Sequence, residues 1–484
     1  MTNTWKHIWL VGGTALLIML GCADVDPNSL DPSETFVKYY GSTDEEDVVD
    51  MVLAPNGTDV LVLCWSTAVG QGKKDILLLS LDANGNSNWQ SIIKSEDSEG
   101  DDTDNVEEIE DMPSGITLSS DSTTVWVIST ADFEEQGEES VYIHRVNISD
   151  GSVADELNFR YYDDRFPDND YNGDKDTRGV DLIEVNEGGD VSLVILGATR
   201  SLPSGPTNDL NTDPFSIFMT RIGTENWDMI PYVDSNGTLR EFASIDERWS
   251  RVNGSNNFDD FGVELAHFEG QFYALTRKDT LSEISTSYGE FDIASGNALR
   301  PFETYTVENI DLNPRSIFVN SGFVYVTGSY DEDDDERPFF LFEIRSALNG
   351  SGVIKVIEKS VAEGETRMGS LTNNDDGSFG TDLVEMENGD FYVVGTIKNH
   401  TNDGNVLKQD EIALIRVGSQ GDLFEDEAGN VLGLRVLGSD QDDNGRVVLR
   451  TSENNLLIGA QIGFGGDATM VSLMKLNDDA EFSN

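Results

Sequence analysis

The stretch DNDYNGDKD, residues 168–176, carries side chains of the kind that bind metal ions. Oxygen-bearing side chains recur there at alternating positions, and a glycine permits a tight turn between them; the residues are Asp168, Asp170, Asn172 and Asp176, around Gly173. In proteins Ca²⁺ takes roughly six to eight oxygen ligands, many of them from carboxylates. The spacing therefore predicts a Ca²⁺ loop, and a solvated acidic loop is the alternative.

Catalytic patterns are much harder to find in the sequence. Its four histidines, His7, His144, His267 and His400, form no pair with the spacing of metal ligands. It holds no Gly-x-Ser-x-Gly elbow and no phosphate-binding glycine loop. With 91 acidic residues, some carboxylates will lie close together whatever the function. The sequence therefore predicts no catalytic residue, and no cofactor apart from Ca²⁺.

The net charge restricts the partners. Across 484 residues, 91 Asp and Glu stand against 31 Lys and Arg, a formal net charge of -60. Such a surface repels nucleic acids and anionic membranes, so no nucleic-acid partner is expected. It suits divalent cations, basic partners or life in high salt. Because the acids are interleaved with apolar segments, a solvated surface is the simplest interpretation.

The N-terminus has the pattern of an export signal. Lys6 and His7 precede an apolar run over residues 8–20, which is short for a membrane span but suits a signal peptide. Met19, Leu20, Gly21 and Cys22 resemble the lipobox of bacterial lipoproteins. This resemblance implies removal of residues 1–21 and acylation of Cys22. An ordinary secretory signal with an incidental cysteine is the alternative.

The resemblance also predicts a location. A lipidated Cys22 would hold the protein in the bacterial cell envelope, at the outer membrane, through a polar tether over residues 22–35. Asp24 and Asp26 resemble the surface-export signals of Bacteroidetes lipoproteins, which extends the expectation to the cell surface. The other cysteine, Cys64, lies in an apolar run and is expected to be a buried free thiol.

A repeated hairpin pattern runs through the rest of the chain. The segments that begin at Asp50, Asp181 and Asp382 each hold an alternating strand, a turn with Asn or Gly, and a more continuously apolar strand. Weaker copies lie between them, so that seven turns are expected, at Gly57, Asp121, Gly189, Gly270, Gly322, Gly389 and Asn455. A repeat of this kind predicts one supersecondary unit, used seven times.

Most hairpins are followed by two more strand patterns, such as those that begin at Asp75 and Leu434. Four strands repeated seven times predict an all-β, seven-bladed β-propeller of four-stranded antiparallel blades over residues 36–477. Little chain remains after the last unit, only a tail over 478–484. The strand at 36–40 is therefore expected to close the last blade. Stacked sandwiches, the rival all-β architecture, would need linkers that the sequence lacks.

The acidic stretches STDEED (42–47) and SDQDDNG (439–445) occupy the same position in two of these units. Asp440, Asp442 and Asn444 repeat the spacing of the predicted Ca²⁺ loop. At this position an acid is expected to accept backbone N–H groups of a turn, and we prefer that interpretation to a second metal site.

The first unit resembles the bacterial β-propeller repeats known as SBBP. The matching positions are Gly41, Asp47, Asn56, Gly57, Asp75, Asp82, Gly85 and Trp89. The loop at 168–176 is similar to the D-x-D-x-N-G-x-x-D loops of integrin-type propellers and to the first half of an EF-hand, although Gly179 replaces the Glu of an EF-hand. The resemblance implies a propeller on an exported protein, without a single activity.

Two functions follow as hypotheses. The first is a lipid-anchored protein of the cell envelope that binds or scaffolds a protein or polymer partner, because long insertions at 95–108 and 200–214 would project from a rigid ring. The alternative is a glycan-processing enzyme or accessory protein with carboxylates at the central channel.

Overall fold

The structure is a computed structural model that describes most of the chain after the predicted tether. The residues described are 35–42, 44–68, 73–94, 110–133, 138–159, 176–199, 215–224, 228–233, 239–244, 247–253, 259–279, 284–305, 311–320, 322–332, 335–344, 353–356, 379–400, 409–424, 433–439, 441–464 and 468–481. They form strands and turns only. Within these ranges no helix has the length and apolar character needed to cross a membrane.

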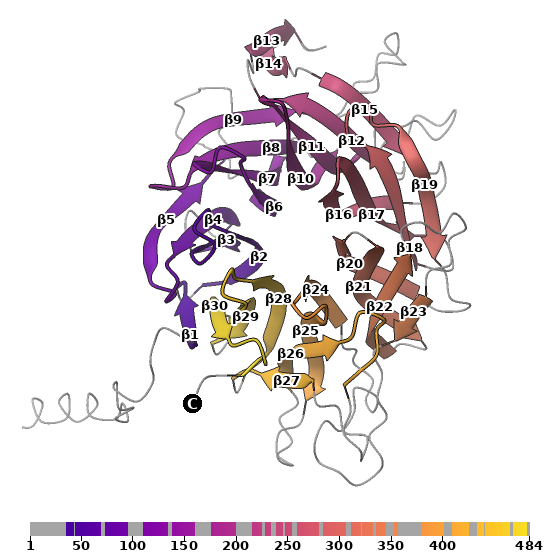
Figure 1. The fold of residues 1–484 in the computed structure, drawn as a ribbon. Coiled ribbons are helices and arrows are strands. Elements are labelled where there is room, and N and C mark those ends of the chain that lie inside the picture. The colour runs from indigo at the N-terminus through magenta and orange to yellow at the C-terminus, as the bar shows by residue number, and fades with distance from the viewer. Residues whose placement is uncertain are drawn as a thin grey trace, which may run out of the picture.

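Seven four-stranded antiparallel sheets surround one axis (Figure 1). Blade 1 is β2 (Glu46–Leu53), β3 (Val60–Ser66), β4 (Asp75–Leu81) and β5 (Ser87–Ile93), and blade 2 is β6 (Glu110–Leu118), β7 (Thr124–Phe133), β8 (Glu138–Asn147) and β9 (Val153–Phe159). Blade 3 is β10 (Thr177–Glu187), β11 (Asp190–Thr199), β12 (Ser216–Gly223) and β15 (Glu247–Asn253), and blade 4 is β16 (Asp260–Phe268), β17 (Gln271–Asp279), β18 (Ile284–Asp292) and β19 (Ala298–Tyr305).

The second half of the ring repeats the pattern. Blade 5 is β20 (Asp311–Val319), β21 (Phe323–Glu332), β22 (Asp335–Ile344) and β23 (Val353–Val356), and blade 6 is β24 (Phe379–Glu385), β25 (Phe391–His400), β26 (Gln409–Val417) and β27 (Leu434–Leu437). Blade 7 is β28 (Asp443–Arg450), β29 (Leu456–Gly463), β30 (Thr469–Leu476) and β1 (Phe36–Tyr40). The predicted seven-bladed propeller is therefore confirmed, including its closure by the N-terminal strand.

One element lies outside the predicted pattern. A two-stranded hairpin, β13 (Asp228–Val233) and β14 (Leu239–Ser244), stands between the third and fourth strands of blade 3 and lies at the edge of the ring in Figure 1. The repeat is least regular in this part of the sequence, so periodicity alone did not separate this hairpin from the fourth strand.

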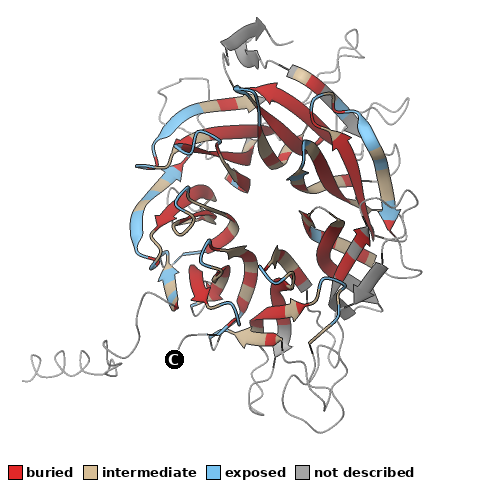
Figure 2. Cartoon of the chain, in the orientation of Figure 1, coloured by how far each residue is buried: buried red, intermediate tan, exposed pale blue. Residues whose placement is uncertain are grey.

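The core is divided among the interfaces between blades. Among the described residues, seven clusters of buried apolar side chains each join two neighbouring sheets; Leu63 of blade 1, for example, packs with Val127 of blade 2. The two middle strands of each blade are accordingly the most deeply buried, while outer strands such as β5 are exposed (Figure 2). A blade covers both of its apolar faces only inside the ring.

Blades 7 and 1 are also joined by polar contacts. The guanidinium of Arg446 donates to both carboxylate oxygens of Asp47, at 3.0 and 2.7 Å. The hydroxyl of Thr469 donates to the carbonyl of Glu46 (2.8 Å). In β1, the Tyr40 hydroxyl donates to the carbonyl of Gly85 in blade 1 (2.5 Å). The first and last strands of the ring therefore meet at an interface held by polar as well as apolar contacts.

The ring has two different faces. On one, the short-turn face, the first and second strands of each blade are joined within the ranges 54–59, 119–123, 188–189, 269–270, 320–322, 386–390 and 451–455. On the other, the long-connection face, the chain passes from blade to blade, through residues 94–109, 160–176 and 357–378 among others. The predicted insertions at 95–108 and 200–214 both leave the ring on the long-connection face.

Deleting residues 36–40 should open the ring and destabilise the whole fold. β1 pairs with β30 over all five residues, and Phe36 and Tyr40 pack in the cluster between blades 7 and 1. We expect a loss of roughly 5 kcal/mol or more in the free energy of unfolding, measured by thermal and chemical unfolding. A deletion of equal length in the tether, residues 24–28, is the control. Equal melting temperatures for the two deletions would contradict closure by β1.

Candidate functional site: the central channel

All seven innermost strands carry a β-bulge at the same level. One extra residue interrupts the pairing of each, namely Val49, Ser114, Val180, Val263, Arg315, Thr381 and Arg446. The residues that follow them are Asp50, Gly115, Asp181, Glu264, Ser316, Asp382 and Val447. A bulge bends the strand and redirects its side chains. Four carboxyl groups thereby stand at one level around the channel.

In each of the seven strands, the backbone N–H of the second residue after the bulged residue donates a hydrogen bond to one of these four carboxylates. The contacts are Asp50 with Met51 (2.7 Å) and Ile116 (3.0 Å), Asp181 with Leu182 and Leu265 (both 2.7 Å), Glu264 with Ile317 (2.5 Å), and Asp382 with Leu383 (2.7 Å) and Val448 (2.8 Å). Buried backbone donors need an acceptor. Seven inward-facing donors are therefore satisfied by four side chains.

Each carboxylate also links its own blade to the next one. Asp50 connects blades 1 and 2, Asp181 connects blades 3 and 4, and Asp382 connects blades 6 and 7. Glu264 reaches blade 5, because the N–H that follows it is already bound to Asp181. The hydroxyl of Ser316 donates to Asp382 (2.8 Å) and so joins blades 5 and 6.

Burial among protein atoms raises the pKa of all four groups. It is the main cause for Asp50, whose pKa rises to about 8 with added repulsion from Asp181 and Asp382. The pKa of Asp181 rises to about 7 and that of Asp382 to about 6, against the opposing effect of the donated N–H bonds. Burial, then repulsion from Asp382 and Asp181, raises the pKa of Glu264 well above its ordinary range.

The arrangement is suited to holding the ring together. A catalytic acid or base must direct a free oxygen at a substrate, whereas Asp50, Asp181 and Asp382 each use both oxygens on backbone donors. Within the described ranges, no three His, Cys, Asp or Glu side chains are placed to hold a metal ion together. The channel carboxylates therefore act as acceptors for the ends of the bulges.

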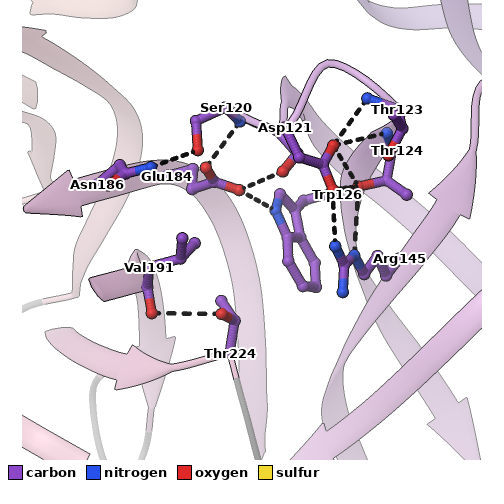
Figure 3. Close-up of polar contacts among 11 residues, drawn as sticks. Ser120, Asp121, Thr123, Thr124, Trp126, Arg145, Glu184, Asn186, Val191 and Thr224 are labelled. Atoms are coloured by element: carbon purple, nitrogen blue, oxygen red, sulfur yellow. Dashed lines mark hydrogen bonds and ion pairs between the residues drawn. The ribbon is translucent and has the colours of Figure 1, made fainter. Parts of the chain in front are cut away.

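Carboxylates on the short-turn face are likewise bound within the fold (Figure 3). Asp121 accepts the N–H of Thr123 (2.7 Å) and pairs with Arg145 (2.9 Å). Glu184 of blade 3 accepts the indole N–H of Trp126 in blade 2 (2.6 Å). These acids close a turn and connect two blades, and their oxygens are directed at the protein itself.

The residues predicted from sequence fall in several places. Cys22, Asp168, Asp170 and Asn172 lie outside the described residues, so the predicted lipidation and Ca²⁺ sites stay predictions. Asp176 lies directly before β10. Cys64 is a buried free thiol, as predicted.

The acidic stretches 42–47 and 439–445 behave as the turn interpretation predicts. Glu46 accepts the N–H of Ser42 (3.0 Å), and Asp443 accepts the N–H of Ser439. In the second stretch, the acid that accepts the turn N–H is Asp443 and not its neighbour Asp442. Asp443 is the first residue of β28, and its carboxylate accepts the N–H of Ser439 across the turn that precedes the strand.

Sequence reasoning did not identify the channel carboxylates as a set. Asp50, Asp181 and Asp382 marked the start of the repeat, but nothing pointed to their role. A signal was present, because Gly-x-Asp/Glu-Leu recurs at 179–182, 262–265 and 380–383. Glycine before an acid and an apolar residue is a pattern that could indicate a bulge.

Comparisons with known proteins add the following. No protein-family model matches the chain, and no curated protein is similar to it in sequence. Among solved structures, a Dyadobacter fermentans protein of unknown function is similar with a TM-score of 0.43 and 9% identity, over 91% of this chain and 97% of that one.

Two further solved structures are similar to the same degree. A Penicillium chrysogenum alpha-L-arabinanase complexed with arabinobiose has a TM-score of 0.42 and 10% identity, over 92% of this chain and 98% of that one. Drosophila Semaphorin 2a has a TM-score of 0.43 and 8% identity, over 91% of this chain and 75% of that one.

The raised pKa values predict a stability that falls with rising pH. A carboxyl group whose folded pKa lies above its unfolded value of 3.8 binds more protons in the folded state. Its contribution is complete at low pH and is lost as the pH rises through the folded pKa. The melting temperature should therefore drop between about pH 5 and pH 9, measured at constant ionic strength.

Asp50→Asn should flatten this dependence above about pH 7, since the folded pKa of Asp50 is about 8. Glu387→Gln, on an exposed short turn, is the control and should leave the slope unchanged. The same slope in Asp50→Asn and in the unmodified chain would show that Asp50 does not titrate in this range.

Proposed function

We propose that this protein is a binding or scaffolding propeller that holds a basic protein or polymer on its long-connection face. The observation that carries the proposal is that the connections from blade to blade, including the acidic stretch over residues 95–109, lie on this face, whereas short turns join the first and second strands of each blade on the other. The third and fourth strands of blades 3 and 6 are also joined on the short-turn face, through residues 224–246 and 418–433. In propellers and other rigid scaffolds, binding residues concentrate on such connections. The propeller would serve as a rigid support for that face.

Charge favours a basic partner. The connection over residues 95–109 holds eight acidic residues and no Lys or Arg. At the described strand ends of the same face, Asp44, Glu45 and Asp442 are exposed. A surface with one sign of charge attracts the opposite charge over a distance of about 8 Å in physiological salt. An acidic face around one opening would therefore capture basic segments.

The position of β1 suits a lipid anchor. The tether predicted over residues 22–35 would enter the ring at Phe36, and β1 begins at its short-turn end. A chain attached to the membrane through Cys22 would thus be held from the short-turn side. The long-connection face would point away from the membrane, toward partners in the envelope or outside the cell. We propose this orientation together with the lipid anchor.

Glycan processing is the second candidate. The observation in its favour is the raised pKa of the channel acids, a property of catalytic acids in many enzymes. Against it, those acids accept two backbone donors in three of four cases. Release of reducing ends from a polysaccharide panel, abolished by Asp50→Asn in a folded protein, would favour this alternative.

Binding to poly-L-lysine tests the first proposal. We expect replacement of the eight acids at 95–109 by amides to weaken binding at least about tenfold at low salt, measured by biolayer interferometry. The control replaces eight acids at the short-turn face, including Glu387, Asp478 and Asp479, and changes the net charge equally. Equal losses in both variants would mean attraction by net charge alone and would contradict a binding face.

Mass spectrometry of the protein from bacterial envelopes tests the anchor. We expect a mature N-terminus at Cys22 that carries acyl chains, and loss of membrane association in Cys22→Ser. Cys64→Ser is the matched control, because that thiol is buried in the ring. A mature N-terminus elsewhere, with Cys22 removed or unmodified, would contradict the lipoprotein prediction.

A further inference from the structure

Two buried acids face each other where blades 6 and 7 meet on the long-connection face. Glu411 of β26 is 6% exposed and Asp443, the first residue of β28, is fully buried. Asp443 accepts N–H groups from Ser439 and from Gly463, the latter at 3.0 Å. In the described part of the chain, no hydrogen bond or ion pair reaches the carboxylate of Glu411. Among the described residues, Glu411 is thus a buried acid without a basic partner.

The two carboxylates border one small space. A Cβ atom on Gly438 would collide with Oε2 of Glu411 and lie 2.8 Å from Oδ2 of Asp443. The side chains approach each other there because glycine leaves the position empty. Burial, followed by repulsion from Asp443, Asp410 and Asp442, raises the pKa of Glu411 to about 7. The site therefore gathers negative charge and holds no positive side chain among the residues described.

The junction between blades 1 and 2 has the same pair of acids and a different neighbour. Strand register makes Asp75 of β4 equivalent to Glu411, and Asp111 of β6 equivalent to Asp443. Here Lys94 follows β5 and its ammonium lies 3.4 Å from Oδ2 of Asp75. Ile93 and Leu437 occupy equivalent positions in the strand pairing of their blades. The residues that follow them, Lys94 and Gly438, are therefore equivalent too.

A second lysine is exchanged in the same way. Lys74 precedes Asp75 and lies 3.8 Å from Glu110, whereas Asp410 precedes Glu411. Two lysines at one junction are thus replaced by Gly438 and Asp410 at the other. Four other junctions have described residues at the positions equivalent to Glu411 and Asp443, and in each at least one of the two residues is uncharged. In that order, the pairs are Ser140 with Thr177, Ser216 with Asp260, Ser285 with Leu312, and Met470 with Glu46.

We propose that a divalent cation binds between Glu411 and Asp443, in the place that the ammonium of Lys94 takes at the equivalent junction. Ca²⁺ and Mg²⁺ prefer carboxylate oxygens and complete their shells with backbone oxygens and water. Water and backbone atoms are needed here, since no three acidic, His or Cys side chains in the described ranges converge on one point. This site is independent of the proposed binding face and of the loop at 168–176.

Calorimetric titration of the full, chelator-treated chain with CaCl₂ and MgCl₂ tests the site. Constant ionic strength, kept with NaCl, removes the general effect of screening a charge of -60. We expect a saturable site whose apparent dissociation constant rises at least about tenfold in Glu411→Gln. The melting temperature of the unmodified chain should rise on saturation, and that of Glu411→Gln should not.

A gain-of-lysine variant makes the test independent of charge removal. Gly438→Lys places an ammonium at the position of Lys94, and the carboxylate of Glu411 has to move to admit the new Cβ atom. The melting temperature of this variant should therefore show no increase when divalent cations are added. Asp75→Asn is the matched control at the lysine-containing junction and should bind the cation as the unmodified chain does. The double variant Asp168→Asn/Asp170→Asn removes two carboxylates of the loop at 168–176. Cation binding that persists in this variant therefore does not come from that loop.

Three results would overturn the proposal. They are the absence of saturable Ca²⁺ or Mg²⁺ binding in the unmodified chain, unchanged affinity in a folded Glu411→Gln, and loss of the same binding in Asp168→Asn/Asp170→Asn. Circular dichroism establishes folding for each variant. If Gly438→Lys fails to fold, Glu411→Gln and Asp75→Asn still decide the outcome.

Discussion

Every blade in this protein depends on its two neighbours to cover its apolar faces. The seven clusters of buried side chains all lie between sheets, so a single blade has no complete core. The ring therefore covers every blade only when it is closed, and β1 closes it by pairing with β30 of the last blade. Such a fold has no exposed end at which blades could be lost one by one.

Closing the ring brings seven strands together at the axis, where backbone donors become difficult to satisfy. Bulges direct seven N–H groups inward, and four carboxylates accept them all. Burial at the axis raises the pKa of all four groups, and repulsion from neighbouring acids adds to it for Asp50 and Glu264. Hydrogen bonding and burial thus act in opposite directions on the same side chains, and pH sets the balance between them.

Much of the fold was predictable because propeller blades repeat. Alternating strands around Asn-Gly turns indicated the hairpins, and the short C-terminal remainder indicated that residues 36–40 close the ring. The channel site was not predictable in the same way. Asp50 and Ile116 are 66 residues apart, and their contact depends on the packing of two blades. The exchange of Lys94 for Gly438 is likewise visible only after strand register makes the two positions equivalent.

The acidity of this protein has a local meaning as well as a general one. On the short-turn face, acids such as Asp390 pair with arginines on neighbouring strands, here Arg416 at 2.7 Å. Between blades 1 and 2, Lys94 lies beside the buried Asp75, and Lys74 lies beside the partly exposed Glu110. Between blades 6 and 7 the same positions hold acids without a basic side chain in the described residues. A buried like-charged pair is costly unless a proton or a cation accompanies it. In a chain with few basic residues, the proposed cation would supply charge that the sequence does not.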